Sequence, residues 1–115
     1  MIYYVDIDET ICYYKDEREY QKAVPNFERI EKINDLYDKG NIIIYWTARG
    51  STTGIDWTKT TQKQLNDWGV KYHELKVKKP HYDVFICDKA INSDSFFNDT
   101  WKTTLHTKYY KPSFA

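Results

Sequence analysis

The sequence opens with Met1-Ile2-Tyr3-Tyr4-Val5-Asp6-Ile7-Asp8-Glu9-Thr10, an apolar run that leads directly into two carboxylates. Residues 2–5 are β-branched or aromatic, which predicts a buried strand. Asp6 and Asp8 are two residues apart, so on an ideal strand their side chains start on the same face. Burying an acidic pair costs free energy unless the pair meets a cation or serves chemistry. Taken alone, the pair fits solvated loop carboxylates after an edge strand equally well.

Composition favours one small domain, residues 1–115, with enough length for a three-layer core. The 17 basic and 17 acidic residues give a formal net charge of +0. This balance argues against bulk attraction to nucleic acid or to an anionic membrane. Aromatic residues make up 17% of the chain, so we expect an aromatic core and some aromatic side chains at a binding or subunit face.

We expect a cytoplasmic protein with reduced thiols. The first strand is predicted from residue 2, which leaves no room for a signal peptide. No apolar run approaches the roughly 20 residues of a membrane span. Cys12 and Cys87 lack the paired spacing of a zinc site, and a cytoplasmic location implies that they remain free thiols.

Hydrophobic patterning predicts alternating strands and helices. Apolar residues at helical spacing behind an N-cap at Asn26 predict a helix over about 27–39. Continuous apolar runs at 42–46 and 84–87 predict strands that are covered on both faces. The remaining predicted elements are a helix at 57–68, a short strand within 70–77 and a short helix at 93–99. Strand, helix and strand in this order predict an α/β class with a parallel sheet.

Two segments lack a clear period. Residues 11–24 are too polar and irregular for a core element, and we expect a turn or small hairpin that forms a flap over the strand ends. The charge run at 15–19 is interpreted as a solvated face. In the C-terminal tail, four large apolar side chains must pack on the body or on a partner: Trp101, Leu105, Tyr109 and Tyr110.

Polar residues follow three of the apolar runs. Asp6, Thr47 and Asp88 each come at a predicted strand end, and ligands of open α/β sheets bind outside the carboxyl ends of the strands. The three side chains are therefore predicted to converge at one edge. For Thr47 alone, an N-cap or turn role is the plainer interpretation.

Four stretches resemble, in order, the four signatures of the haloacid dehalogenase (HAD) superfamily, over about residues 2–92. The matching residues are Asp6, Asp8 and Thr10, then Thr47, then Lys79, and last Asp88. The resemblance implies a three-layer Rossmann-like core with a central, mainly parallel sheet. The segments 11–24 and 47–79 are too short to hold an inserted cap domain, so we expect none.

The resemblance also implies roles. Asp6 would be the nucleophile that forms an aspartyl phosphate, and Asp8 the general acid and then the general base. Thr47 would bind phosphoryl oxygens, and Lys79 would neutralise charge on the phosphoryl group. Lys78 is an adjacent alternative; Lys79 is favoured because Pro80 follows it and fits a helix start.

A magnesium site is implied as well. The Asp6 carboxylate, the backbone carbonyl of Asp8 and the Asp88 carboxylate, with waters, would suit octahedral Mg²⁺. Many relatives carry two consecutive acids in the fourth signature, whereas this chain has Cys87 before Asp88, so weaker Mg²⁺ affinity or reduced activity is expected.

Two further residues are substrate-binding candidates in this pattern. Thr10 would brace the loop, with simple turn-capping as an equal alternative. Arg49 would contact substrate or pair on the surface.

Several short stretches resemble small phosphatase-like proteins of capsule and surface polysaccharide biosynthesis, among them Trp46-Thr47-Ala48-Arg49-Gly50 and Lys79-Pro80-His81-Tyr82-Asp83. This resemblance implies a Mg²⁺-dependent phosphomonoester hydrolase for a sugar phosphate, working as a homo-oligomer, a dimer or tetramer. A polynucleotide-end phosphatase is an alternative that the neutral charge disfavours. A non-catalytic subunit that binds Mg²⁺ or phosphate is a third possibility, favoured by Cys87 alone.

Overall fold

The computed structural model describes residues 1–98, which fall into two compact units, Met1–Asp83 and a second that begins at Val84. The organisation into a single domain therefore stays a prediction. The predicted packing of Trp101 and the other large apolar residues of the tail lies outside the described residues. No helix in residues 1–98 is long and apolar enough to cross a membrane.

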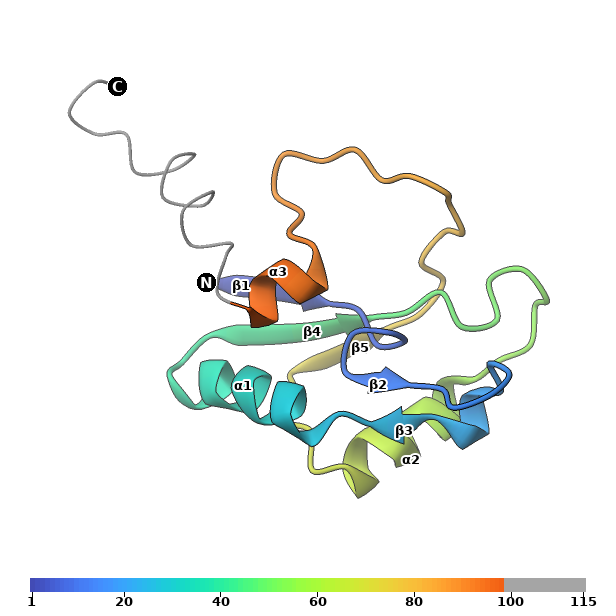
Figure 1. The fold of residues 1–115 in the computed structure, drawn as a ribbon, viewed down its shortest axis with the longest axis horizontal. Coiled ribbons are helices and arrows are strands. Elements are labelled where there is room, and N and C mark those ends of the chain that lie inside the picture. The colour runs from blue at the N-terminus through green and yellow to red at the C-terminus, as the bar shows by residue number, and fades with distance from the viewer. Residues whose placement is uncertain (99–115) are drawn as a thin grey trace. The chain divides into compact units, whose positions relative to one another are not determined.

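The first unit is built on a parallel sheet. Its strands β1 (Ile2–Val5), β4 (Ile42–Trp46) and β5 (Glu74–Lys76) lie in the order β1-β4-β5 (Figure 1). Because the strands are parallel, their carboxyl ends lie at the same edge of the sheet. The predicted α/β class is confirmed, and so are the two longer strands of this sheet.

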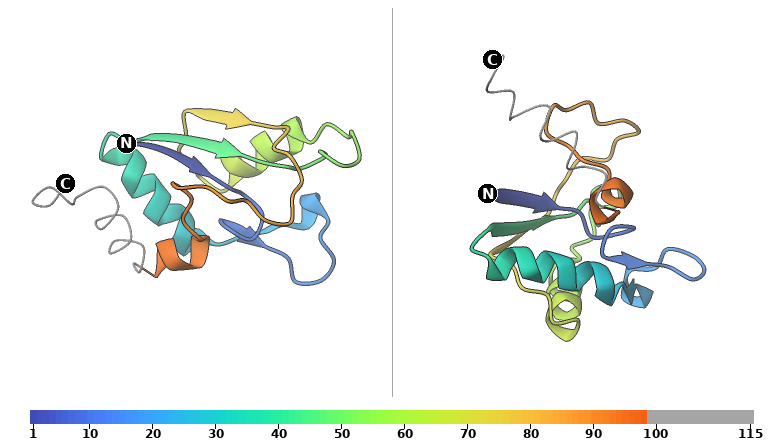
Figure 2. Two further views of the ribbon diagram at one scale, coloured as in Figure 1. Left: turned by 90° about the horizontal axis from the view of Figure 1, so that it is seen from above. Right: turned by 60° about the vertical axis from the view of Figure 1, so that its left-hand side comes forward.

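Two helices, α1 (Phe27–Asp38) and α2 (Thr58–Asp67), cover one face of this sheet (Figures 1 and 2). The predicted N-cap of α1 is present, since the Asn26 side chain accepts a hydrogen bond from the Arg29 amide. The core forms where the helices meet β1 and β4, and its side chains are at most 8% exposed: Val5, Ile30, Ile33, Ile43, Tyr45 and Leu65. Burial of this apolar face, more than helix propensity, stabilises the two helices.

A small hairpin follows β1. Its strands β2 (Cys12–Tyr13) and β3 (Val24–Pro25) pair antiparallel, and the 3-10 helix η1 (Tyr20–Lys22) lies between them. The predicted hairpin is confirmed, but the start of this segment is buried, which its polar composition did not suggest. Ile11 is fully buried and Cys12 is 2% exposed. A tight turn, in which the Thr10 and Ile11 amides both donate to the Ile7 carbonyl, directs the chain back into the core.

The second unit contains the helix α3 (Ser93–Phe97), close to its predicted position. The Asn92 side chain caps α3 by accepting hydrogen bonds from the Asp94 and Ser95 amides. The strand predicted at 84–87 was wrong: these residues form no strand, and Val84 and Ile86 are 75% and 93% exposed. An apolar run becomes a strand only when a neighbouring strand pairs with its backbone, and no described strand pairs with this one.

Candidate functional site

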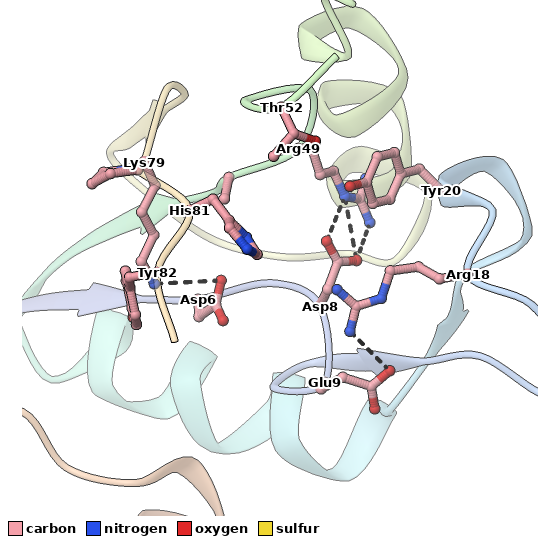
Figure 3. A pocket seen from close by; sticks show the side chains of 12 residues that line it. Asp6, Asp8, Glu9, Arg18, Tyr20, Arg49, Thr52, Lys79, His81 and Tyr82 are labelled. Carbon is pink, nitrogen blue, oxygen red and sulfur yellow. Dashed lines mark hydrogen bonds and ion pairs between the residues drawn. The ribbon is translucent and has the colours of Figure 1, made fainter. Parts of the chain in front are cut away.

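A polar recess of about 360 Å³ lies in the first unit, where the chain leaves β1, β4 and β5 (Figure 3). Its walls come from the loop after β1, the hairpin, the loop after β4 and the segment after β5. The lining residues are Asp6, Asp8, Glu9, Arg18, Tyr20, Ala48, Arg49, Thr52, Lys79, Pro80, His81 and Tyr82. The structure therefore brings Asp6, Asp8, Arg49 and Lys79, all predicted from sequence, into one recess.

Asp6 faces Lys79 across this recess. The Lys79 Nζ atom lies 3.9 Å from Asp6 Oδ1, and the Asp6 side chain is 43% exposed (Figure 3). Asp6 Oδ1 also accepts a hydrogen bond of 2.9 Å from the Ile7 amide. Burial raises the pKa of Asp6 above its ordinary value, although Lys79 and the Ile7 amide act in the opposite direction. Asp6 is thus a partly exposed carboxylate, and the Lys79 ammonium group lies near it without a hydrogen bond between them.

Asp8 is held differently, by a buried arginine. Arg49 Nη2 donates to Asp8 Oδ1 at 2.8 Å, and Arg49 Nε donates to Asp8 Oδ2 at 3.1 Å. The Tyr14 hydroxyl also donates to Asp8 Oδ1. Burial alone would raise the pKa of Asp8, but the hydrogen bonds and charge of Arg49, together with Tyr14, leave this pKa below its ordinary value. The Asp8 carboxylate is therefore ionised at neutral pH in this arrangement.

The Arg49 guanidinium connects three segments. The Arg49 side chain is 1% exposed. The sequence left two roles open for this residue, and pairing on the surface is excluded by its burial. Its Nη1 atom donates to Thr61 and Gln64 of α2 at 3.1 and 2.6 Å, and its Cζ atom lies 4.9 Å from the ring centroid of Tyr20. Arg49 thereby fixes Asp8 against both α2 and the hairpin.

Three other predicted residues line no part of the recess. Thr47 is 1% exposed, and its hydroxyl oxygen accepts a hydrogen bond from the Arg49 amide. Thr10 lies in the tight turn after β1, where its carbonyl accepts a hydrogen bond from the Arg29 side chain. Lys78 is exposed and has a φ of +66°, and the next residue, Lys79, is the one that lines the recess. The predicted helix start at Pro80 is wrong, since residues 81–92 contain no helix.

Asp88 lies in the second unit, in a stretch without helix or strand, and is exposed. The neighbouring Cys87 thiol lies 3.8 Å from Asp88 Oδ1. Within residues 1–98, no group of three His, Cys, Asp or Glu side chains is arranged to hold a metal. The first unit supplies two of the predicted magnesium ligands, Asp6 and the Asp8 carbonyl, and the joint ligand set with Asp88 stays a prediction.

The hairpin contributes a charged residue that sequence reasoning missed, Arg18, which pairs with Glu9 of the loop after β1. Arg18 Nη2 lies 3.4 Å from Glu9 Oε1, and the Arg18 guanidinium lies 5.6 Å from the Tyr14 ring centroid. In the sequence, Arg18 belongs to the charge run at 15–19, which was interpreted as a solvated face. Only the fold of the hairpin shows that one member of the run turns toward the recess.

Comparison with known proteins gives one kind of match, a structural one. A scan against protein-family models finds no match, and a search of curated proteins finds no significant relative. The fold is similar to the crystal structure of an MCSG target from Vibrio cholerae, with a TM-score of 0.78 and 24% sequence identity. The alignment covers 96% of this chain and 98% of the other. At this identity the likeness establishes a shared α/β fold.

Proposed function

We propose that this chain is a capless phosphatase of the HAD type, with a three-layer core, which hydrolyses a phosphomonoester with the help of Mg²⁺. One observation carries the proposal: the neighbouring carboxylates Asp6 and Asp8, and Lys79 from a distant part of the sequence, line one recess at the carboxyl edge of a parallel sheet. Ligands of open α/β sheets bind at this edge. Two carboxylates and a cation are the groups that nucleophilic phosphoryl transfer requires.

In the first step, an Asp6 carboxylate oxygen attacks phosphorus, and the bond from phosphorus to the leaving oxygen breaks. The leaving oxygen takes up a proton from Asp8. In the second step, water attacks the phosphorus of the aspartyl phosphate and gives a proton to Asp8, which releases orthophosphate and restores Asp6. Lys79 stabilises the negative charge on the phosphoryl oxygens in both steps.

The Arg49 pair bears on the two roles of Asp8. An ionised Asp8 is ready to accept the proton of the attacking water, so the pair favours the base role. The acid role requires a proton that the pair disfavours. Hydrolysis of an aryl phosphate, whose leaving group needs little protonation, should therefore depend less on Asp8 than hydrolysis of a sugar phosphate.

The charges in the recess favour a divalent cation. Three carboxylates (Asp6, Asp8 and Glu9) face three cations (Arg18, Arg49 and Lys79), so a phosphate dianion would leave the recess with a net negative charge. Mg²⁺ binds through one or two carboxylates together with waters and substrate phosphate. The Asp6 carboxylate and the Asp8 carbonyl, both in the first unit, would hold it together with waters. When bound, Mg²⁺ would offset repulsion between Asp6 and the phosphoryl oxygens.

A sugar phosphate is the substrate that suits the lining best. The recess is also lined by four side chains whose polar groups can form hydrogen bonds with hydroxyl groups: Glu9, Arg18, Thr52 and His81. With this lining we propose a small, hydroxyl-rich phosphorylated metabolite, handled by a cytoplasmic homo-oligomer.

Hydrolysis of an aryl phosphate, with Mg²⁺ and then with a chelator, tests the proposal. Wild-type protein should hydrolyse the aryl phosphate only when Mg²⁺ is present. Asp6→Asn should lower the activity by at least about 10³-fold, since the nucleophile is removed. Asp16→Asn, an exposed hairpin position outside this recess, is the matched control and should retain activity. Full activity in Asp6→Asn would exclude the mechanism.

A second candidate is a non-catalytic subunit that binds phosphate or Mg²⁺. The specific observation in its favour is that Arg49 donates hydrogen bonds to both carboxylate oxygens of Asp8, which disfavours protonated Asp8 and so opposes its role as a general acid. This candidate predicts phosphate binding without turnover, so the same assay, combined with calorimetric titration of orthophosphate, separates the two.

A further inference from the structure

Two aromatic rings flank Lys79. The Lys79 Nζ atom lies 5.6 Å from the ring centroid of Trp46 and 5.6 Å from that of Tyr82. Trp46 is the last residue of β4, and Tyr82 follows β5, so the rings come from two segments. The Lys79 side chain is 17% exposed, and Figure 3 shows Tyr82 beside it near Asp6. Both distances are within the range of cation–π attraction.

The other two cations in the recess each lie near one aromatic ring and close to a carboxylate, whereas Lys79 lies near two rings and farther from its carboxylate. Arg49 contacts Asp8 at 2.8 Å, and Arg18 contacts Glu9 at 3.4 Å, so a carboxylate offsets each guanidinium. Aromatic faces attract a cation through their quadrupole and carry no net charge. They therefore fix the ammonium group without cancelling its charge. The carboxylate beside Lys79, Asp6, remains 3.9 Å away.

We propose that Trp46 and Tyr82 are positioning residues, which hold the Lys79 ammonium beside Asp6 so that its charge remains available to the phosphoryl group. The proposal rests on the proposed phosphatase function. An unrestrained lysine side chain adopts many rotamers, and confining it costs free energy that the two rings supply before substrate arrives.

The backbone of Lys79 is anchored separately. Its amide donates to the Thr47 carbonyl at 3.1 Å, and its carbonyl accepts a hydrogen bond of 2.7 Å from the Ser51 hydroxyl. Neither bond involves the rings. Replacing a ring therefore leaves the backbone of Lys79 in place and tests the position of the side chain alone.

The first test measures kcat/KM for an aryl phosphate in Trp46→Leu and Tyr82→Leu, with Trp46→Phe and Tyr82→Phe as conservative variants. Each leucine variant should lose roughly three- to tenfold, and each phenylalanine variant should stay within about twofold of wild type. Tyr13→Leu is the matched control, because Tyr13 and Tyr82 are both 42% exposed, and it should be unchanged. Wild-type activity in the leucine variants, or equal losses in the leucine and phenylalanine variants, would overturn the positioning role.

A second test does not depend on turnover. Lysines are reductively methylated with ¹³C, and the Lys79 methyl signal is identified by its absence in Lys79→Arg. Ring currents from Trp46 and Tyr82 should move the chemical shift of this signal upfield. In each leucine variant the shift should return toward the values of the exposed lysines. A wild-type signal among the exposed lysines would overturn the proposal. If the wild-type protein hydrolyses nothing, the proposed function fails, and the methyl signal alone decides whether the rings hold Lys79.

Discussion

Replacing Arg49 by methionine should strongly destabilise the protein. The Arg49 side chain is 1% exposed and the Asp8 side chain 10% exposed, so the substitution leaves a nearly buried carboxylate without its cation. It also removes the donor to Thr61, which is itself 1% exposed. Breaking a buried ion pair from one side costs about 3–5 kcal/mol. With a typical urea m-value, the midpoint of unfolding should fall by roughly 2 M.

The matched control is Arg18→Met, which breaks a second Arg–carboxylate pair in the same recess. Arg18 lies 3.4 Å from Glu9, and the two side chains are 50% and 56% exposed, so solvent screens the pair. Its loss should cost at most about 1 kcal/mol. Adding Asp8→Asn to Arg49→Met should recover part of the stability, because the uncompensated charge is removed.

The assay is urea unfolding followed by tryptophan fluorescence at pH 7, with the free energy of unfolding compared between variants. If Arg49→Met and Arg18→Met cost the same, or if Asp8→Asn recovers nothing in the Arg49→Met background, then the pair does not stabilise the site as argued.

Three further predictions concern the fold and its thiols. Gly50→Ala should cost well over 2 kcal/mol in urea unfolding, because φ is +80° and a Cβ would lie 1.9 Å from a backbone carbonyl oxygen; Gly40→Ala, at φ +92° in open space, should cost only about 1–2 kcal/mol. Equal losses would contradict this account. Tyr45→Phe should raise the free energy of unfolding by about 1 kcal/mol, because the buried Tyr45 hydroxyl has no hydrogen-bond partner among residues 1–98. A lower free energy of unfolding in this variant would refute the prediction. Burial and the nearby Asp8 raise the pKa of Cys12 to about 12, so thiolate is scarce there at pH 8. Iodoacetamide at pH 8 should therefore label the exposed Cys87 and spare Cys12 until the protein unfolds, as mass spectrometry would show.

The sequence predicts elements best where local periodicity and burial agree. The apolar spacing behind Asn26 correctly predicts α1, and the run at 42–46 correctly predicts β4, which lies between two other strands. The run at 84–87 is also continuously apolar, yet it forms no strand. Backbone pairing is a property of neighbours in space, and an apolar run does not specify its neighbours.

The sequence likewise predicts some features of the candidate site and not others. Asp6 and Asp8 are found from the sequence because they follow a predicted strand, whereas Lys79 is found only through the resemblance to the HAD signatures. The burial of Arg49 is not predictable from the sequence. Its acceptors Thr61 and Gln64 lie 12 and 15 residues away, on a helix whose orientation depends on tertiary packing. Long side chains reach partners that sequence spacing does not reveal.

The most direct test of the central claim is a search for phosphate on Asp6. Protein mixed with substrate and Mg²⁺ is quenched in acid, digested, and analysed by mass spectrometry. The account predicts that the N-terminal peptide gains the mass of one phosphoryl group at Asp6, and that Asp6→Asn abolishes this gain. Turnover of substrate with the phosphoryl group on another residue, or with unmodified Asp6 throughout, would contradict the account.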